Sequence, residues 1–351
     1  MQTRRLGSSS LDLLPVAFGA WAIGGWWWGP NDDEEACLAL HAWLDGGGRA
    51  IDTAPVYGFG HSERLIARVL RQRRDRALIL TKAGLVWDQA QGVLAFQTKD
   101  QTGAARRVLR NSRPASLRRE VEQSLERLGV ERIDLLQIHW RDETTPIAES
   151  MGALLELKRE GKIAWIGVSN FRPDDLLEAR AALGTEPLVS TQERLSLMDR
   201  RVVPGALGFA REHGLGFLAY SPLEQGLLTG KLTPERQFKP GDLRAQHAKF
   251  EPKARQRVLE VLHSCALPIA QRHGATLAQV ALAWVFQTPG VTCALAGARN
   301  AQQARENLAA AKILLSGDEY AALDHGFAAL GQGAGKLGTL GKLARRLFGR
   351  S

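Results

Sequence analysis

Four ionisable side chains follow three consecutive apolar segments of the sequence. Asp52 and Tyr57 lie in the stretch IDTAPVYGFGHSE, Lys82 follows the run LILT, and His139 follows the run LLQI. A carboxylate, a phenol, an ammonium group and an imidazole can together carry acid–base chemistry, because neighbouring groups shift the pKa of each. Each residue alone has an ordinary structural explanation, so the prediction depends on whether the fold brings the four together.

The order of the expected elements indicates how these side chains could meet. Apolar runs of strand length alternate with amphipathic helical segments in eight strand–helix units, and no Pro/Gly/Ser-rich linker interrupts them. Strict alternation predicts parallel strands joined by helices. Eight units favour an α/β fold of the closed (β/α)8 TIM-barrel type over an open doubly wound sheet, since no GxGxxG follows the first strand. Catalytic groups of such barrels lie at the C-terminal ends of the strands.

Composition limits the other classes of function. The net charge of +9 is partly concentrated in the arginine-rich segment 106–119, which has no interleaved aromatic residues, so we expect no nucleic-acid partner. The longest apolar stretch, residues 16–29, is shorter than the roughly 20 residues of a membrane helix. The three cysteines have no metal-ligand spacing, which predicts no metal site and a reducing, cytoplasmic location. The N-terminus shows no signal-peptide pattern.

We expect two segments along the chain. Residues 1–325 would form the barrel, and residues 326–351 a basic Gly/Leu-rich tail. Leucines recur at roughly helical spacing among the basic residues of the tail. This pattern predicts a short amphipathic helix that packs on the barrel or on a neighbouring subunit, with association with an acidic membrane surface as the alternative.

The sequence resembles the aldo-keto reductase superfamily from Arg4 to about Asp324. The motifs that carry the likeness occur in the family's order: RRLGSSSLDLLPVAFGAWAIGG, IDTAPVYGFGHSE, LILTKAG, DLLQIHW, GKIAWIGVSNF, AYSPLEQGLLTGK and GARNAQQARENL. A finer likeness is to bacterial reductases resembling myo-inositol-associated and channel-β-subunit-like members. The resemblance implies a barrel with an N-terminal β-hairpin plug, NADPH as cofactor, and reduction of a small carbonyl substrate to an alcohol.

The resemblance also implies a role for each of the four ionisable residues. Tyr57 would donate a proton to the carbonyl oxygen as hydride reaches the carbon. Lys82 would favour the phenolate and so ease release of the proton. Asp52 would keep Lys82 charged and in place, and His139 would orient the carbonyl oxygen through a ring N–H.

The same matching assigns the cofactor contacts to three regions. The nicotinamide carboxamide would be held by Ser169, Asn170 and Gln192. The pyrophosphate would lie along Ser221, Leu223, Gly226 and Lys231, where small residues allow close approach of backbone N–H groups. The adenosine end would contact Gly297, Arg299, Gln303, Glu306 and Asn307. Arg299 is the expected contact of a 2′-phosphate.

Two residues depart from the family pattern, and two tryptophans are expected at the substrate. Leu195 stands where we expect an aromatic residue that stacks on the nicotinamide. Arg141 replaces a usual proline and is either a surface charge or a group that favours anionic substrates. Trp21 and Trp87 are expected to line the substrate pocket.

A second function remains open at this point. Channel β subunits keep the barrel and the cofactor, so the chain could instead be an NADPH-binding, redox-sensing regulatory subunit with slow or no turnover. Turnover of a carbonyl substrate would separate the two hypotheses.

Overall fold

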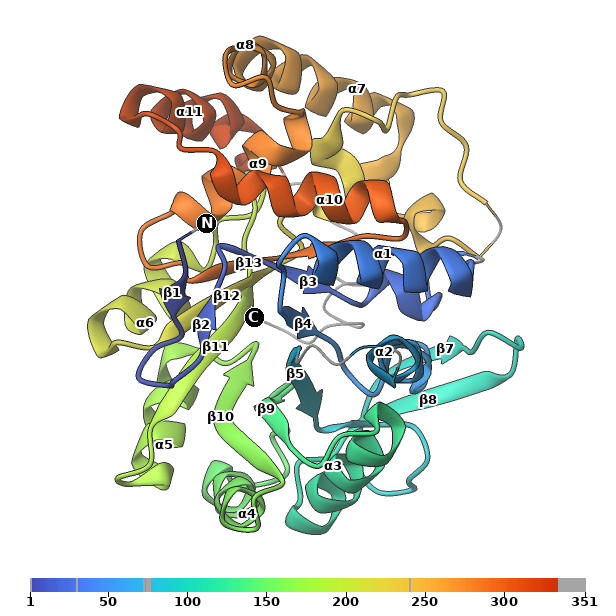
Figure 1. Cartoon of the computed structure of the whole chain (residues 1–351), viewed down its shortest axis with the longest axis vertical. Coiled ribbons are helices and arrows are strands. Elements are labelled where there is room, and N and C mark those ends of the chain that lie inside the picture. The colour runs from blue at the N-terminus through green and yellow to red at the C-terminus, as the bar shows by residue number, and fades with distance from the viewer. Residues whose placement is uncertain (1, 30, 72, 74–76, 240, 334–351) are drawn as a thin grey trace.

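The computed structural model describes residues 2–29, 31–71, 73, 77–239 and 241–333. Eight parallel strands form a closed barrel in which chain order is also spatial order, and the last strand pairs with the first (Figure 1). These strands are β3 (Val16–Gly19), β4 (Ala50–Asp52), β5 (Leu78–Ala83), β9 (Ile133–Ile138), β10 (Ile163–Ser169), β11 (Leu188–Arg194), β12 (Gly216–Tyr220) and β13 (Cys293–Gly297). The predicted (β/α)8 barrel is therefore confirmed.

Helices surround the barrel, and local sequence signals define their ends. They are α1 (Asp33–Asp45), α2 (His61–Arg71), α3 (Pro114–Leu128), α4 (Ile147–Arg159), α5 (Pro173–Leu183), α6 (Gly208–His213), α7 (Pro252–Val261), α8 (Leu267–Arg272), α9 (Leu277–Gln287), α10 (Ala301–Ala309) and α11 (Gly317–Gly333). The side chain of Asp32 caps α1 by accepting the N–H groups of Glu34 and Glu35. Helix α3 starts at Pro114 and ends at Gly129, whose φ of 65° suits a left-handed C-cap.

The N-terminal hairpin closes one end of the barrel. Strands β1 (Arg4–Arg5) and β2 (Asp12–Leu13) pair antiparallel, and Leu6 and Leu13 are buried in the cluster that fills the barrel interior. Gly7, at φ 53°, lies against the backbone at the start of β11 and β12, where a Cβ atom would come within 2.3 Å of the carbonyl oxygen of Val189. The hairpin therefore plugs the end opposite the strand C-termini, as expected.

A small antiparallel sheet after β5 was not predicted from the sequence. It consists of β6 (Leu85–Val86), β7 (Val93–Lys99) and β8 (Ala105–Arg110), and Figure 1 shows β7 and β8 projecting beside the barrel. Its buried face joins an aromatic cluster that contains Trp26 and Phe96, with Tyr57 packed against the cluster. The arginine-rich segment is thus partly a strand whose side chains face two different environments.

The segment between β12 and α7 contacts the loop that follows β3. It contains the short helical turns η3 (Glu224–Thr229), η4 (Leu243–Gln246) and η5 (Ala248–Phe250). The N–H of Leu243 donates to the carbonyl oxygen of Trp27 at 3.0 Å, and Trp28 forms a β-bridge with Asp242. Two loops from distant parts of the sequence therefore meet beside the barrel mouth.

The last described helix spans the residue where the tail was expected to begin, and the division into barrel and tail stays a prediction. Helix α11 continues through the expected boundary at residue 325 and is described as far as Gly333. The rest of the expected tail, including its amphipathic leucine pattern, lies outside the described residues. Within the described part of the chain, no helix is both long and apolar enough to span a membrane.

Candidate active site

The four ionisable residues converge at the C-terminal end of the barrel. Asp52 ends β4, Lys82 lies near the end of β5, and His139 follows β9, while Tyr57 is in the loop that leads to α2. The side chains of Lys82 and Asp52 are only 1% and 5% exposed. Parallel strand ends therefore bring together residues that are widely separated in the sequence.

The ammonium group of Lys82 is fully hydrogen-bonded. Its Nζ donates to Asp52 Oδ1 at 2.7 Å, to the carbonyl oxygen of Thr53 at 3.0 Å and to the hydroxyl of Tyr57 at 3.4 Å. These contacts use all three donors of an ammonium group. The other carboxylate oxygen of Asp52 accepts from Gln192 Nε2 at 2.8 Å. The buried ion pair is therefore held in one geometry, with its cation directed at the phenol.

Burial decides the protonation of the phenol and the imidazole. Burial, with the charge of Asp52, raises the pKa of Tyr57 well above its ordinary value. Burial and the charge of Lys82 hold the pKa of His139 well below its ordinary value. At neutral pH Tyr57 therefore carries its proton and His139 is neutral, with one ring N–H to donate.

The pKa of Tyr57 shifts upward, whereas a neighbouring lysine was expected to lower it. Lys82 was expected to make the phenol more acidic, but burial outweighs the attraction of a cation whose charge Asp52 already balances. Burial also lowers the pKa of Lys82, and Asp52 opposes that shift. The role of Lys82 as the cation that favours the phenolate therefore stays a prediction, which rests on the contact between its Nζ and the Tyr57 hydroxyl.

The residues expected at the nicotinamide form one hydrogen-bonded group. Asn170, at φ 60°, donates from Nδ2 to the carbonyl oxygen of His139 at 3.0 Å and to Ser169 Oγ at 2.9 Å. Ser169 Oγ in turn donates to the carbonyl oxygen of Gln192 at 2.8 Å. The three predicted carboxamide contacts therefore lie together and are linked to the tetrad through His139 and Asp52.

Glu193 supports the turn that carries Asn170, a role that the sequence did not indicate. Its carboxyl group accepts from the N–H of Phe171 at 3.1 Å and from Thr191 Oγ1 at 3.0 Å. Burial raises the pKa of Glu193 to about 8. The left-handed conformation of Asn170 is thus held by a buried carboxyl group on the neighbouring strand.

Leu195 does not occupy the position that was expected for it. Its side chain is fully buried in the core between barrel and helices, so it presents no face to the mouth. Tyr220, at the end of β12, is partly exposed and donates from its hydroxyl to Asn170 Oδ1 at 2.9 Å. The expected stacking position at Leu195 is therefore wrong, and Tyr220 is the aromatic ring beside the predicted carboxamide contacts.

Leu195→Tyr is expected to destabilise the fold instead of tightening cofactor binding. A phenol in a filled core forces side chains out of their preferred rotamers, at a cost of about 1–3 kcal/mol. Denaturant unfolding and cofactor titration measure the two effects, with the volume-conserving Leu195→Met as control. Unchanged stability together with tighter cofactor binding would restore the original interpretation.

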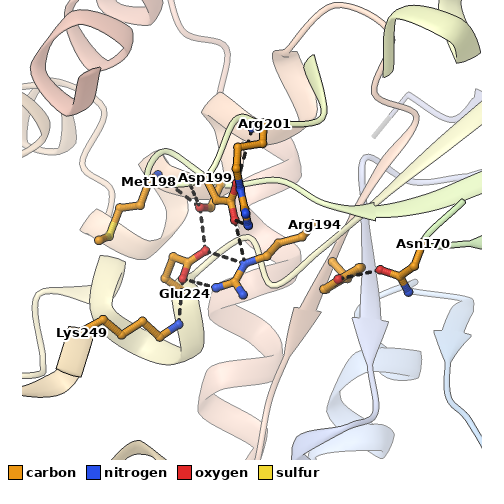
Figure 2. A network of polar contacts seen from close by, with 9 residues as sticks. Asn170, Arg194, Met198, Asp199, Arg201, Glu224 and Lys249 are labelled. Carbon is orange, nitrogen blue, oxygen red and sulfur yellow. Dashed lines mark hydrogen bonds and ion pairs between the residues drawn. The ribbon is translucent and has the colours of Figure 1, made fainter. Parts of the chain in front are cut away.

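The expected pyrophosphate segment begins in an unusual backbone conformation. Ser221, Glu224, Gln225 and Gly226 all have positive φ, between 49° and 97°. Figure 2 shows the carboxylate of Glu224 directed at Arg194 and Lys249. This buried carboxylate lies 2.5 Å from Arg194 and has two further partners. The partners are Lys249 Nζ at 2.9 Å and Ser196 Oγ at 2.8 Å.

The charges of this network explain why a buried glutamate stays ionised. Although burial opposes ionisation, Arg194 and Lys249 hold the pKa of Glu224 well below its usual range. Asp199 lies 3.4 Å from Arg194 and 2.7 Å from Arg201, so it balances part of the excess positive charge (Figure 2). The network joins the end of β11 to both ends of the segment between β12 and α7.

The residues expected at the adenosine end lie around the start of α10. The N–H of Arg299 donates to Gln303 Oε1 at 2.9 Å, and Asn307 Nδ2 donates to the carbonyl oxygen of Gly297 at 3.0 Å. Glu306 lies 3.3 Å from Lys231 Nζ, which links the expected pyrophosphate and adenosine regions. The residues expected at the adenosine end therefore lie together in one region of the fold.

Two arginines and a tryptophan lie together where these loops meet. Arg299 and Arg244 lie over the ring of Trp28, at 6.0 and 5.1 Å from its centre. Trp28 Nε1 is buried and has no hydrogen-bond partner among the described residues. Burial and the charge of Arg244 lower the pKa of Arg299. Arg244 is already paired with Asp242 at 2.6 Å, so the groups that suit a phosphate of the expected dinucleotide are the orphan N–H donor and the guanidinium group of Arg299.

The two tryptophans expected at the substrate are both partly buried and contact different aromatic rings. The ring of Trp21 is 6.4 Å from that of Tyr57, and Trp87 packs edge-on against Phe59 at 5.4 Å. Both pack, with Trp140, against the aromatic cluster under the β6–β8 sheet. Trp21 is thus beside the phenol, whereas Trp87 is beside Phe59.

Arg141 is held within its own loop. Its Nη1 donates to the carbonyl oxygens of Asp142 and Thr145, and its Nε lies 3.7 Å from Asp175. These contacts fit the surface-charge interpretation and leave no support for a direct role with anionic substrates.

The barrel, its hairpin plug and its strand-end tetrad define the class, and the chain belongs to the aldo/keto reductase family. The family model matches residues 15–326. The chain is 37% identical over 320 residues to the NADH-specific methylglyoxal reductase of Escherichia coli (strain K12), covering 89% of this chain and 94% of that one. It is 33% identical over 305 residues to the aldo-keto reductase YhdN of Bacillus subtilis (strain 168), covering 86% of each.

A solved structure is similar over nearly the whole chain. The glycerol dehydrogenase AKR11B4 from Gluconobacter oxydans superposes with a TM-score of 0.82 and 39% sequence identity, covering 93% of this chain and 95% of that one. Family membership supports an oxidoreductase that acts on carbonyl groups with a nicotinamide cofactor.

Proposed function

We propose that the protein reduces small aldehydes and ketones to alcohols, with Tyr57 as general acid and NADPH as the preferred cofactor. The observation that carries this proposal is the buried Asp52–Lys82 ion pair, whose third ammonium N–H is directed at the Tyr57 hydroxyl. An ion pair that served only stability would not require aromatic rings and a phenol at the barrel mouth beside it.

The roles of the residues follow from their protonation. A bound reduced nicotinamide supplies hydride to the carbonyl carbon. Negative charge then develops on the carbonyl oxygen, where Tyr57 donates its proton and neutral His139 donates a hydrogen bond. Lys82 stabilises the phenolate that remains, and Asp52 keeps Lys82 charged in a buried site. Tyr220 and Asn170 position the ring that carries the hydride.

The regulatory-subunit alternative gains no specific support from the site. It would use the same cofactor contacts, but nothing in the geometry favours binding without turnover. The free cysteines Cys37, Cys265 and Cys293 support a reducing compartment, and we place the protein in the cytoplasm on that basis.

The choice between NADPH and NADH depends on the start of α10. The E. coli relative is NADH-specific by name, but residues 297–303 here contain no acidic side chain and one arginine. Arg299 and Arg244 lie over one tryptophan ring, and the helix N-terminus adds N–H groups that favour an anion. These features support a site for the 2′-phosphate, the only group by which NADPH differs from NADH.

Arg299→Ala is expected to weaken NADPH binding about ten- to a hundredfold, which corresponds to one charge-assisted hydrogen bond, and to leave NADH binding nearly unchanged. Titrations of both cofactors into wild type and variant measure this, with the exposed Arg305→Ala of the same helix as control. Equal losses for both cofactors, or a wild-type preference for NADH, would contradict the assignment of Arg299.

A further inference from the structure

A second cation approaches the aromatic cluster from the β6–β8 sheet. Arg110 is the last residue of β8, and Val108, two residues earlier, is fully buried in the cluster. Side chains two apart in a strand share a face, and Arg110 is paired directly across from Leu85, another member of the cluster. Arg110 therefore points to the mouth side of the sheet, whereas Arg107 is exposed on the strand.

The guanidinium group of Arg110 lies close to the tetrad. It sits over the ring of Trp140 at 5.3 Å from the ring centre, and Trp140 is the residue directly after His139. Trp140 packs against the same cluster as Tyr57 and Trp87. A substrate whose carbonyl group is at Tyr57 would thus extend along these rings toward Arg110.

Within the described part of the chain, the side chain of Arg110 keeps a donor without a partner. Its Nε is buried and without a hydrogen-bond partner, and within the described chain no carboxylate lies within 4.0 Å of its guanidinium group. The carboxylates whose charges act on the pKa of Arg110 are those of Glu143 and Asp142. Asp142 already accepts hydrogen bonds from the N–H of Ser112 and from two threonine hydroxyls. A partly buried cation that lacks an ion pair is costly unless something else neutralises it.

A second hydrogen-bond donor without a partner belongs to Gln89, which contacts Asn111. Gln89, in the loop between β6 and β7, accepts from Asn111 Nδ2 through its Oε1 at 3.1 Å, so its amide N–H₂ points elsewhere. Gln89 Nε2 is buried and has no partner among the described residues. This second donor is linked to Asn111, the residue after Arg110, and not to Arg110 itself.

We propose that Arg110 recognises an anionic group at the end of the substrate remote from the carbonyl, and that the preferred substrates are short aldehydes or ketones bearing a carboxylate or a phosphate monoester. The inference rests on the proposed carbonyl reduction at Tyr57. A planar guanidinium fork matches both kinds of anion. Arg141, which the sequence suggested for such a role, is turned into its own loop.

Matched pairs of substrates test the proposal. The first pair is 4-carboxybenzaldehyde and 4-methylbenzaldehyde, and the second is glyceraldehyde 3-phosphate and glyceraldehyde. For each pair, the ratio of kcat/KM for the charged over the neutral aldehyde is measured in wild type, Arg110→Met and the exposed control Arg107→Met. The wild-type ratio is expected to fall about ten- to a hundredfold in Arg110→Met, as for loss of a charge-assisted contact, and to stay constant in Arg107→Met. The pair with the larger fall identifies carboxylate or phosphate as the preferred anion.

A binding measurement keeps the test separate from turnover. Calorimetric titration with benzoate and with inorganic phosphate is expected to show binding to wild type that Arg110→Met loses and Arg110→Lys partly retains. Wild-type anion binding that depends on Arg110, in a protein that reduces none of the aldehydes, would support the anion site and reject the proposed function. An unchanged ratio in folded Arg110→Met, equal losses for charged and neutral aldehydes, or anion binding indifferent to Arg110 would overturn the proposal.

Discussion

Tyr57→Phe is expected to lower carbonyl reduction by about 10²–10⁴-fold, the usual contribution of a general acid, while cofactor binding stays close to that of wild type. The substitution removes only the hydroxyl, whose hydrogen bond from Lys82 at 3.4 Å is the weakest of that lysine's three. Because the pKa of Tyr57 is raised by burial, its proton is available over the whole physiological range. Steady-state turnover and cofactor titration measure the two effects separately.

A matched control exists in the same chain. Tyr320→Phe removes a hydroxyl that contacts Thr288 Oγ1 at 3.0 Å, outside the mouth, and is expected to leave turnover unchanged. Near-normal turnover of aldehydes by Tyr57→Phe would show that another group donates the proton.

Lys82→Met is the second large effect, and it acts on stability as well as on turnover. The variant leaves the carboxylate of Asp52 buried without its cation, and breaking such a pair costs about 3–5 kcal/mol. Turnover should fall about a hundredfold or more, because the phenolate left by proton transfer loses its neighbouring charge. Denaturant unfolding and kcat/KM measure the two losses.

The double variant Asp52→Asn/Lys82→Met separates the two roles. Without the buried carboxylate there is no unpaired charge, and an asparagine can still accept the hydrogen bond that Gln192 Nε2 gives at 2.8 Å. Much of the lost stability is therefore expected to return, while turnover stays low. Recovery of turnover in the double variant would mean that Lys82 acts only as a structural partner of Asp52.

The sequence predicted the barrel and its tetrad because both follow from local patterns. Alternating apolar runs and amphipathic helices define parallel strands, and strand ends determine where Asp52, Lys82 and His139 meet. Motif order added the hairpin plug and the cofactor regions.

The features that were missed depend on contacts between distant segments. The β6–β8 sheet was missed because the arginines of β8 suggest a solvent-exposed segment. Only the contacts of Val108 with distant residues show which face of β8 is buried. The burial of Leu195 was missed because burial after the end of a strand is decided by the helices behind it, and Tyr220 was not considered for the nicotinamide site. The role of Glu224 needs Arg194 and Lys249 beside it, and sequence spacing contains no sign of either.

Reaction of the purified wild-type protein with bound reduced cofactor and a panel of small aldehydes tests the central claim most directly. Loss of reduced nicotinamide and formation of alcohol are followed together, for NADPH and NADH. We expect one alcohol to form per nicotinamide oxidised, and this reaction to be lost in Tyr57→Phe protein that still binds the cofactor. Bound cofactor that no aldehyde in the panel oxidises would reject carbonyl reduction and favour a regulatory subunit.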